Sequence, residues 1–227
     1  MTTICDNHQI VQSRMSAACA ASGRPASSVR LLAVSKTFGA DAVQLAYAAG
    51  QRAFGENYIQ EAVEKISALR HLPLQWHCIG PIQSNKTRLV AEHFDWVQTI
   101  DRLKIAQRLS EQRTPHLAPL QVCIQVNMDG GPTKSGVAPE DALALARAVS
   151  ELPRMHVRGI MCIPEPAPDF VAACAVFARA RALFDQMNSA GMGLDTLSMG
   201  MSNDLEAAIT SGSTLVRVGS AIFGERG

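Results

Sequence analysis

Strand-like segments alternate along this chain with helical patterns, and this alternation restricts the fold more than any other feature of the sequence. The predicted strands cover residues 30–35, 51–55, 74–79, 95–100, 119–127, 155–163, 195–199 and 214–218. The predicted helices that follow them cover residues 40–49, 57–69, 84–93, 102–112, 139–152, 170–190 and 203–211, with a short final turn at 220–223. Such alternation is typical of an α/β fold with a parallel sheet covered by helices.

Eight such units within 227 residues favour a closed (β/α)8 barrel, the TIM barrel, which needs roughly 200–250 residues. An additional amphipathic helix is predicted at 3–22, before the first strand. An open doubly wound sheet is the alternative, but no GxGxxG motif follows the first strand. Because no linker or low-complexity segment interrupts the pattern, residues 1–227 are predicted to form a single domain.

Composition excludes several classes of function. The formal net charge is +1 and no long basic stripe is present, which disfavours nucleic acid as a partner. No apolar run approaches the roughly 20 residues of a membrane span. Polar residues at 6–9 replace the apolar segment of a signal peptide, and none of the six cysteines has metal-site spacing. We therefore expect a cytoplasmic protein without a metal centre.

Lys36 ends the first predicted strand, and this fold places its chemistry at the carboxyl ends of strands. Side-chain alternation puts Leu32, Val34 and Lys36 on one face of that strand. A lysine that is partly desolvated there loses preference for its ammonium form and becomes a nucleophilic amine. The alternative interpretation is a solvated lysine at a strand end.

Arg217 lies between two valines in the last predicted strand and shares a face with Leu215 and Gly219. A buried guanidinium is costly unless it is paired. Two interpretations remain open from the residues alone. Arg217 forms a structural ion pair with a strand-end carboxylate, or it recognises a ligand atom in the mouth of the barrel.

The turns after the last two strands have the composition of a phosphate site. Ser202 follows Gly200 after one strand, and Gly219 and Ser220 follow the other. In this fold the corresponding loops often bind phosphate, although each could be an ordinary turn with a serine cap. Together with Lys36 and Arg217, these turns indicate a site for pyridoxal 5′-phosphate, with a Schiff base to the lysine.

Several motifs also carry a resemblance to a known family. They lie at residues 33–37, 54–57, 76–80, 83–86, 125–127, 197–204 and 216–224. In these segments the chain resembles the pyridoxal phosphate homeostasis protein family, and the match runs along almost the whole chain. That family is similar to the N-terminal barrel domain of alanine racemase without the second domain.

The resemblance implies a role for each candidate residue. Lys36 would hold the cofactor as an imine, and Arg217 would lie near the pyridine nitrogen. Ser202, Gly219 and Ser220 would bind the phosphate, and Asn57 would lie close to the cofactor.

Other positions are less specific or depart from the family pattern. The resemblance implies that His77 and Met199 line the pocket, although His77 alone is as well explained as a core histidine. Phe38 and Pro81 replace a lysine and a histidine that are common in the family. Lys134 matches a family lysine that assists cofactor transfer, with a solvated loop lysine as the alternative.

A guanidinium at the pyridine nitrogen opposes protonation of that nitrogen, because it is always charged and only donates hydrogen bonds. An unprotonated pyridine is a weak electron sink. Tyr47 and Tyr58, the only tyrosines, lie within or at the start of predicted helices, so neither is an obvious second base. We therefore expect no catalytic residue and a cofactor carrier. A weak amino-acid racemase and a Schiff-base aldolase for a phosphorylated sugar are the alternatives.

The expected role is intracellular homeostasis of pyridoxal 5′-phosphate, with indirect effects on amino-acid and keto-acid metabolism. Apo-enzymes that depend on the cofactor would be transient partners. The domain that builds the racemase dimer has no counterpart in the predicted barrel, which favours a monomer.

Overall fold

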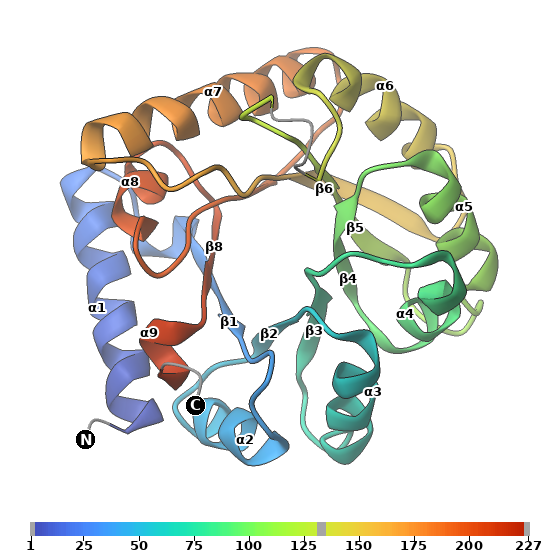
Figure 1. Ribbon diagram of the computed structural model, residues 1–227, viewed down its shortest axis with the longest axis horizontal. Helices are drawn as coiled ribbons and strands as arrows, with labels where there is room; N and C mark the ends of the chain where they lie inside the picture. The colour runs from blue at the N-terminus through green and yellow to red at the C-terminus, as the bar shows by residue number, and fades with distance from the viewer. Residues whose placement is uncertain (1–2, 131–134, 225–227) are drawn as a thin grey trace.

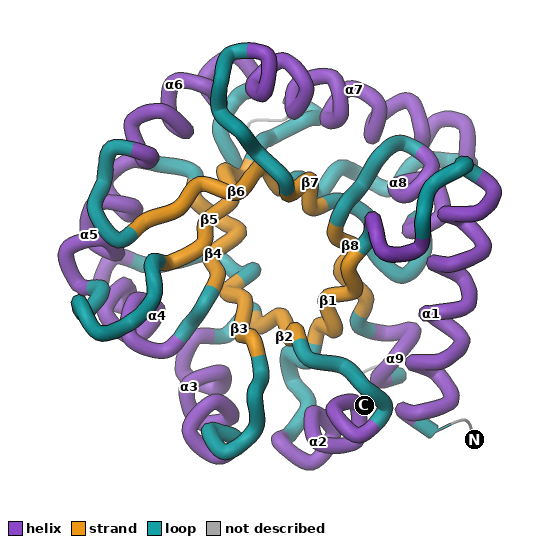
Figure 2. The backbone as a smooth tube through the Cα atoms, turned by 180° about the vertical axis from the view of Figure 1, so that it is seen from behind, coloured by secondary structure: helices purple, strands orange, loops and turns teal. Residues whose placement is uncertain are grey.

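The computed structural model describes residues 3–130 and 135–224 and contains a closed barrel of eight parallel strands. The strands are β1 Arg30–Val34, β2 Ala53–Glu56, β3 Gln75–Cys78, β4 Trp96–Ile100, β5 Leu120–Gln125, β6 Met155–Met161, β7 Thr196–Ser198 and β8 Leu215–Val218. Each strand pairs with the next, and β8 pairs with β1 (Figure 2). The prediction of a (β/α)8 barrel is thereby confirmed.

Helices surround the barrel (Figure 1). They are α1 Ile4–Ala21, α2 Ala40–Ala48, α3 Ile59–Ala68, α4 Thr87–His93, α5 Leu103–Gln112, α6 Pro139–Ser150, α7 Phe170–Ser189, α8 Leu205–Thr210 and α9 Ser220–Phe223. The extra N-terminal helix α1 packs beside α8 and α9, where Val11 and Met15 are buried. Thr3 and Asp6 cap its first turn reciprocally, which fixes where the helix begins.

The predicted boundaries differ from the structure by a few residues, for local reasons. The helix predicted at 84–93 begins as a single 3-10 turn, η2 Ser84–Lys86, before α4. The strand predicted at 119–127 ends at Gln125, because Val126 leaves the strand and forms an isolated bridge with Val137. The strand predicted to reach residue 163 ends at Met161, two residues before exposed Ile163.

Apolar side chains form separate cores outside and inside the sheet. The larger core fills the space between strands and helices. Inside the barrel, a smaller cluster contains Leu32, Val34, Ile79 and Leu215, and another contains Trp96, Cys123 and Met161. Leu32 and Leu215 therefore face the interior, and alternation directs Arg217 to the same interior.

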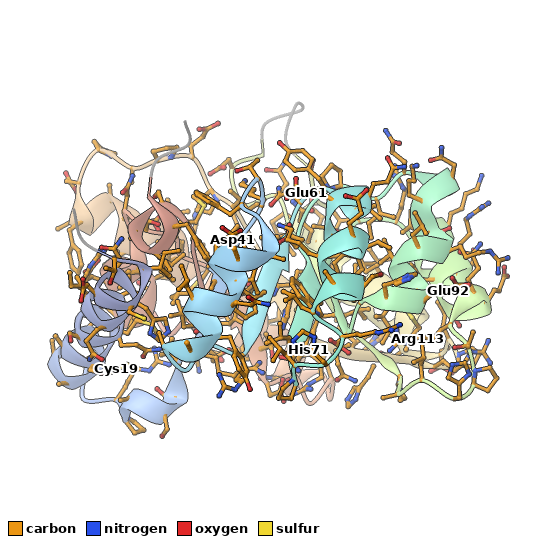
Figure 3. All side chains as sticks on the ribbon, turned by 90° about the horizontal axis from the view of Figure 1, so that it is seen from below. Cys19, Asp41, Glu61, His71, Glu92 and Arg113 are labelled. Atoms are coloured by element: carbon orange, nitrogen blue, oxygen red, sulfur yellow. The ribbon has the colours of Figure 1, made fainter. Side chains whose placement is uncertain are left out.

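The two ends of the barrel are chemically distinct. Figure 3 shows Glu61, near the start of α3, toward one end, and His71, in the loop that leads into β3, toward the other. The carboxyl ends of the strands and the starts of the helices share the first end. Within residues 3–130 and 135–224, no helix combines the length and apolar character needed to cross a membrane.

Candidate functional site

A cavity of about 810 Å3 opens at the carboxyl ends of the strands. Every residue predicted to bind the cofactor lines it, namely Lys36, Asn57, Ser202, Arg217, Gly219 and Ser220. They come from the ends of β1, β2 and β8 and from the loop after β7. The fold thus brings together six residues that span most of the chain.

Lys36 and Arg217 lie on either side of the seam where β8 meets β1. Leu32 of β1 is paired with Arg217 of β8. Lys36 follows Leu32 by four residues, toward the carboxyl end of the barrel. Lys36 is half-buried. At Gly219 a Cβ atom would lie 3.2 Å from the carbonyl oxygen of Val34, so the absence of a side chain lets the chain turn close to β1.

The Arg217 guanidinium is buried, with 4% of the residue exposed. Its Nη1 donates to Oγ of Ser198 at 2.7 Å, and its Nη2 donates to the carbonyl oxygen of Cys162 at 2.9 Å. Burial lowers the pKa of the guanidinium. Both partners are neutral, and no carboxylate among the described residues forms an ion pair with Arg217. A structural ion pair is therefore not the reason for this buried cation.

Two hydroxyl groups meet at the wall formed by the loops after β7 and β8. Ser220 donates to Ser202 across 3.2 Å between their Oγ atoms, and the backbone N of Ala221 lies 3.4 Å from the same Ser202 oxygen. Arg14 of α1 donates to the carbonyl oxygen of Ser202 at 3.0 Å. At Gly200, φ is +95°, a conformation that favours glycine. The extra helix therefore supports the loop that presents these hydroxyl groups.

Asn57 follows β2 and contributes an unsatisfied acceptor. Its Oδ1 atom is buried and has no hydrogen-bond partner among the described residues. Leaving a buried acceptor unpaired costs about 1–3 kcal/mol. Gly80 packs against the backbone of Asn57, where an added Cβ would lie 2.2 Å from the carbonyl oxygen. The position of Asn57 is thus fixed while one of its polar atoms remains available to a ligand.

A buried ionic cluster next to Lys36 was not predicted from the sequence. Nζ of Lys65 lies 2.6 Å from Oε1 of Glu56 and 2.8 Å from Oε1 of Glu61. The same ammonium donates to the carbonyl oxygen of Ser35 at 2.8 Å, and Oγ of Ser35 donates to Glu56 at 2.6 Å. Burial raises the pKa of Glu56, against the lowering effect of Lys65.

This cluster fixes the backbone on both sides of Lys36. Glu61 accepts a hydrogen bond from the backbone N of Thr37 at 2.9 Å, and Thr37 has a φ of +69°. A threonine with positive φ is strained and persists only where neighbours hold it. The one sequence signal was the spacing of Glu61 and Lys65, four residues apart on a predicted helix.

Two residues implied by the resemblance do not line the cavity, which corrects that expectation. His77 is fully buried inside the barrel and stacks on Trp96, with ring centroids 4.9 Å apart. Met199 packs in the outer core. His77 therefore lies too deep in the barrel to reach the mouth, and Met199 lies on the side that faces the helices.

Phe38 and Pro81, the two residues that depart from the family pattern, line different cavities. Phe38 lines the cavity and stacks on Phe223 with centroids 5.2 Å apart. Pro81 borders a smaller neighbouring cavity of about 160 Å3. Lys134 lies outside the described residues. Neither Tyr47 nor Tyr58 is among the described residues that line the large cavity.

The loop after β6 forms an apolar wall that was predicted only as a rigid connection. Ile163, Pro164, Pro166 and Phe170 line the cavity from this side. The proline spacing indicated rigidity, but the sequence did not indicate which way the loop folds.

Buried thiols near the strands are poor nucleophiles. Burial raises the pKa of Cys78, Cys123 and Cys162 to about 12.

Among residues 3–130 and 135–224, no cluster of three or more His, Cys, Asp or Glu side chains is arranged to hold a metal.

Comparison with known proteins agrees with this architecture. Residues 11–227 match the family "Alanine racemase, N-terminal domain". A pyridoxal phosphate homeostasis protein of Pseudomonas aeruginosa is 59% identical over 226 residues, covering 100% of this chain and 97% of its own. The PipY protein of Synechococcus elongatus, whose structure was determined with the cofactor bound, is 38% identical with a TM-score of 0.81, covering 94% of this chain and 100% of PipY.

An alanine racemase of Clostridium difficile shares the fold alone, with a TM-score of 0.74 at 15% identity. This chain covers 57% of that racemase, so the barrel is the shared part. The fold and the cavity thus define a barrel protein of the alanine racemase N-terminal class. Within that class, the identity of 59% over the whole chain shows that it belongs to the pyridoxal phosphate homeostasis protein family.

Proposed function

We propose that this protein binds pyridoxal 5′-phosphate in the large cavity, with Lys36 as its covalent anchor. The observation that carries the proposal is the convergence of Lys36, Arg217 and the Ser202–Ser220 pair on one cavity. The bound cofactor supplies an aldehyde, which condenses with a primary amine to a C=N bond and releases water. The PLP-bound structure of PipY supports the same ligand class.

The residues present fit such a ligand. The hydroxyl groups of Ser202 and Ser220 donate to phosphate oxygens, and Gly219 leaves room for the backbone to approach. The buried Arg217 guanidinium supplies donors for a neutral ring nitrogen. The unpartnered Oδ1 of Asn57 accepts from a donor on the ligand or from a water beside it.

We further propose a carrier rather than an enzyme. Arg217 keeps the ring nitrogen unprotonated, because a fixed cation that only donates repels a second positive charge. Neither tyrosine is among the described residues of the cavity wall, so the second base of a racemase has no tyrosine candidate there. The names of the relatives favour a homeostatic role.

As a carrier, the protein would buffer the cofactor and release it to apo-enzymes that depend on it. Its influence on amino-acid and keto-acid metabolism would then be indirect. We propose that it acts in the cytoplasm and as a monomer, a state that size-exclusion chromatography with light scattering would test.

Visible absorption of the purified protein with added pyridoxal 5′-phosphate tests the proposal. The wild type should develop the band of a protonated imine, and Lys36→Ala should not. Lys104→Ala, which removes an exposed lysine on α5, is the matched control and should retain the band. A colourless wild type refutes cofactor binding through an imine. Rapid deuterium exchange at the α-carbon of alanine would instead support the weak racemase.

A further inference from the structure

A chain of hydrogen bonds runs through the interior of the barrel from Arg217 to β3. Arg217 Nη1 donates to Ser198 Oγ at 2.7 Å, and Ser198 Oγ donates to Gln98 Oε1 at 2.6 Å. Gln98 Nε2 lies 3.0 Å from His77 Nδ1, and His77 Nε2 lies 3.0 Å from Gln75 Oε1. The chain therefore links β8, β7, β4 and β3 beneath the cavity.

The donor character of Arg217 and the orientation of the Gln98 amide, with Oε1 toward Ser198 and Nε2 toward His77, together define the direction of each bond in this chain. A guanidinium only donates hydrogen bonds, so the Ser198 hydroxyl accepts one from Arg217. The same hydroxyl donates a second hydrogen bond to the side-chain carbonyl oxygen of Gln98. The Gln98 amide nitrogen then donates to Nδ1 of His77. Nε2 of His77 must consequently carry the ring proton, which it donates to Gln75. One neutral tautomer of His77 satisfies the whole chain.

Burial makes the arrangement rigid. Ser198, Gln98 and His77 each have 0% exposure, and the His77 ring stacks on Trp96 at an interplanar angle of 9°. Water cannot replace a lost partner easily at such depth, so each group depends on its neighbour. The positive charge of Arg30 near His77 also disfavours a protonated ring.

We infer that Ser198 and Gln98, supported by neutral His77, are positioning residues that aim the Arg217 guanidinium at the ligand's ring nitrogen. Nη1 and Nη2 each have a protein partner, Ser198 and Cys162, and Arg217 also lines the cavity. This hydrogen-bond relay, formed by Arg217, Ser198, Gln98, His77 and Gln75, holds the guanidinium with fixed N–H directions. Within the described part of the chain, no carboxylate forms an ion pair with it. This arrangement would make the site prefer ligands whose aromatic ring contains a nitrogen that accepts a hydrogen bond. This inference rests on the proposed function.

The test compares two ligands, pyridoxal 5′-phosphate and its 1-deaza analogue, in which C–H replaces the ring nitrogen. The dissociation constants of both are measured for the wild type, Ser198→Ala, Ser198→Thr and Ser213→Ala. Ser213 is the matched control, since its hydroxyl is equally buried between β7 and β8 but donates to backbone oxygens outside the relay.

Ser198→Ala should weaken binding of the natural cofactor about tenfold, the typical effect of losing a hydrogen bond to a charged group, and should leave the analogue unaffected. Ser198→Thr keeps the hydroxyl and should restore the preference. Ser213→Ala should leave the preference between the two ligands unchanged. Equal weakening of both ligands by Ser198→Ala, or none, overturns the inference because the effect would then be structural or absent.

A second measurement needs no cofactor. Nitrogen-15 NMR of the cofactor-free protein should show His77 as the neutral tautomer with the proton on Nε2, and a proton on Nδ1 would overturn the relay. If the wild type takes up neither ligand, the proposed function fails, whereas the tautomer of His77 still decides whether the relay exists.

Discussion

The ammonium of Lys65 in α3 lies 2.8 Å from the carbonyl oxygen of Ser35, the residue that directly precedes Lys36. Lys65 also contacts the buried carboxylate of Glu56 at 2.6 Å. Lys36, the proposed covalent anchor, is therefore attached to a backbone segment that Lys65 holds through a hydrogen bond to Ser35. Lys65 is paired with two carboxylates, Glu56 and Glu61, and supports the backbone rather than lining the cavity.

Replacing Lys65 with Met should destabilise the protein by about 3–5 kcal/mol, because Glu56 would remain buried without its partner. Urea denaturation measures the change. Arg88→Met is the control, since Arg88 is 68% exposed at the side chain and lies 3.6 Å from Glu92; it should cost less than about 1 kcal/mol. The double variant Lys65→Met/Glu56→Gln should regain part of the loss. No recovery in the double variant would show that the charge of Glu56 is not the cause.

His77 should make the protein sensitive to mild acid. Burial, with a smaller effect of Arg30, holds the pKa of His77 well below its usual 6.5 in the folded state. As pH falls below that usual value, the unfolded chain takes up a proton that the folded chain does not, so the free energy of unfolding decreases by about 1.4 kcal/mol per pH unit. Above it, His77 contributes no pH dependence.

Denaturation curves of wild type and His77→Gln at several pH values check this effect. The stability difference between the two proteins should change between about pH 7 and pH 5 and stay constant above. A stability difference that stays constant at every pH would show that His77 has the same pKa in the folded and the unfolded protein.

Asn57→Ala should separate stability from binding. The substitution removes an unpaired buried acceptor, so the cofactor-free protein should lose little stability or gain some, within about 1 kcal/mol. Cofactor affinity should nevertheless fall. Asn188→Ala is the matched control, because Asn188 has both amide atoms bonded to Leu194 far from the cavity. Asn188→Ala should lower the melting temperature and leave the affinity for the cofactor unchanged. An unchanged affinity in Asn57→Ala as well would contradict a ligand role for Asn57.

Ser202→Ala tests the phosphate wall. Affinity for pyridoxal 5′-phosphate should fall about tenfold, and affinity for pyridoxal, which has no phosphate, should not change. Fluorescence titration with both compounds measures the ratio. Equal losses for the two compounds would place the phosphate elsewhere.

The barrel, and the six predicted residues that line its large cavity, could be predicted from local patterns. Strand-length runs followed by helical patterns give the architecture, and alternation gives the residues that share a face, Leu32 with Lys36 and Leu215 with Arg217. The structure shows that these faces point into the barrel. The closure of β8 on β1 then brings Lys36 and Arg217 together. Glycine and serine at the loop after β7 marked a further wall of the cavity.

The supporting contacts were not predictable, because they join residues that no sequence spacing relates. Ser198 and Gln98 are 100 positions apart and meet only inside a closed barrel. Lys65 reads as the end of a surface pair with Glu61, yet its side chain is buried, with 6% exposed. The resemblance implied His77 at the cavity, with a core histidine as the equal alternative, and neighbouring residues in the sequence do not show how deep a side chain lies in the barrel.

The most direct test of the central claim is to locate the covalent anchor. Protein mixed with pyridoxal 5′-phosphate is reduced with borohydride, digested, and analysed by mass spectrometry. We predict a pyridoxyl modification on the peptide that contains Lys36, at one equivalent per chain, and none at Lys65. A modification concentrated at another lysine, or no stable modification at all, would contradict it.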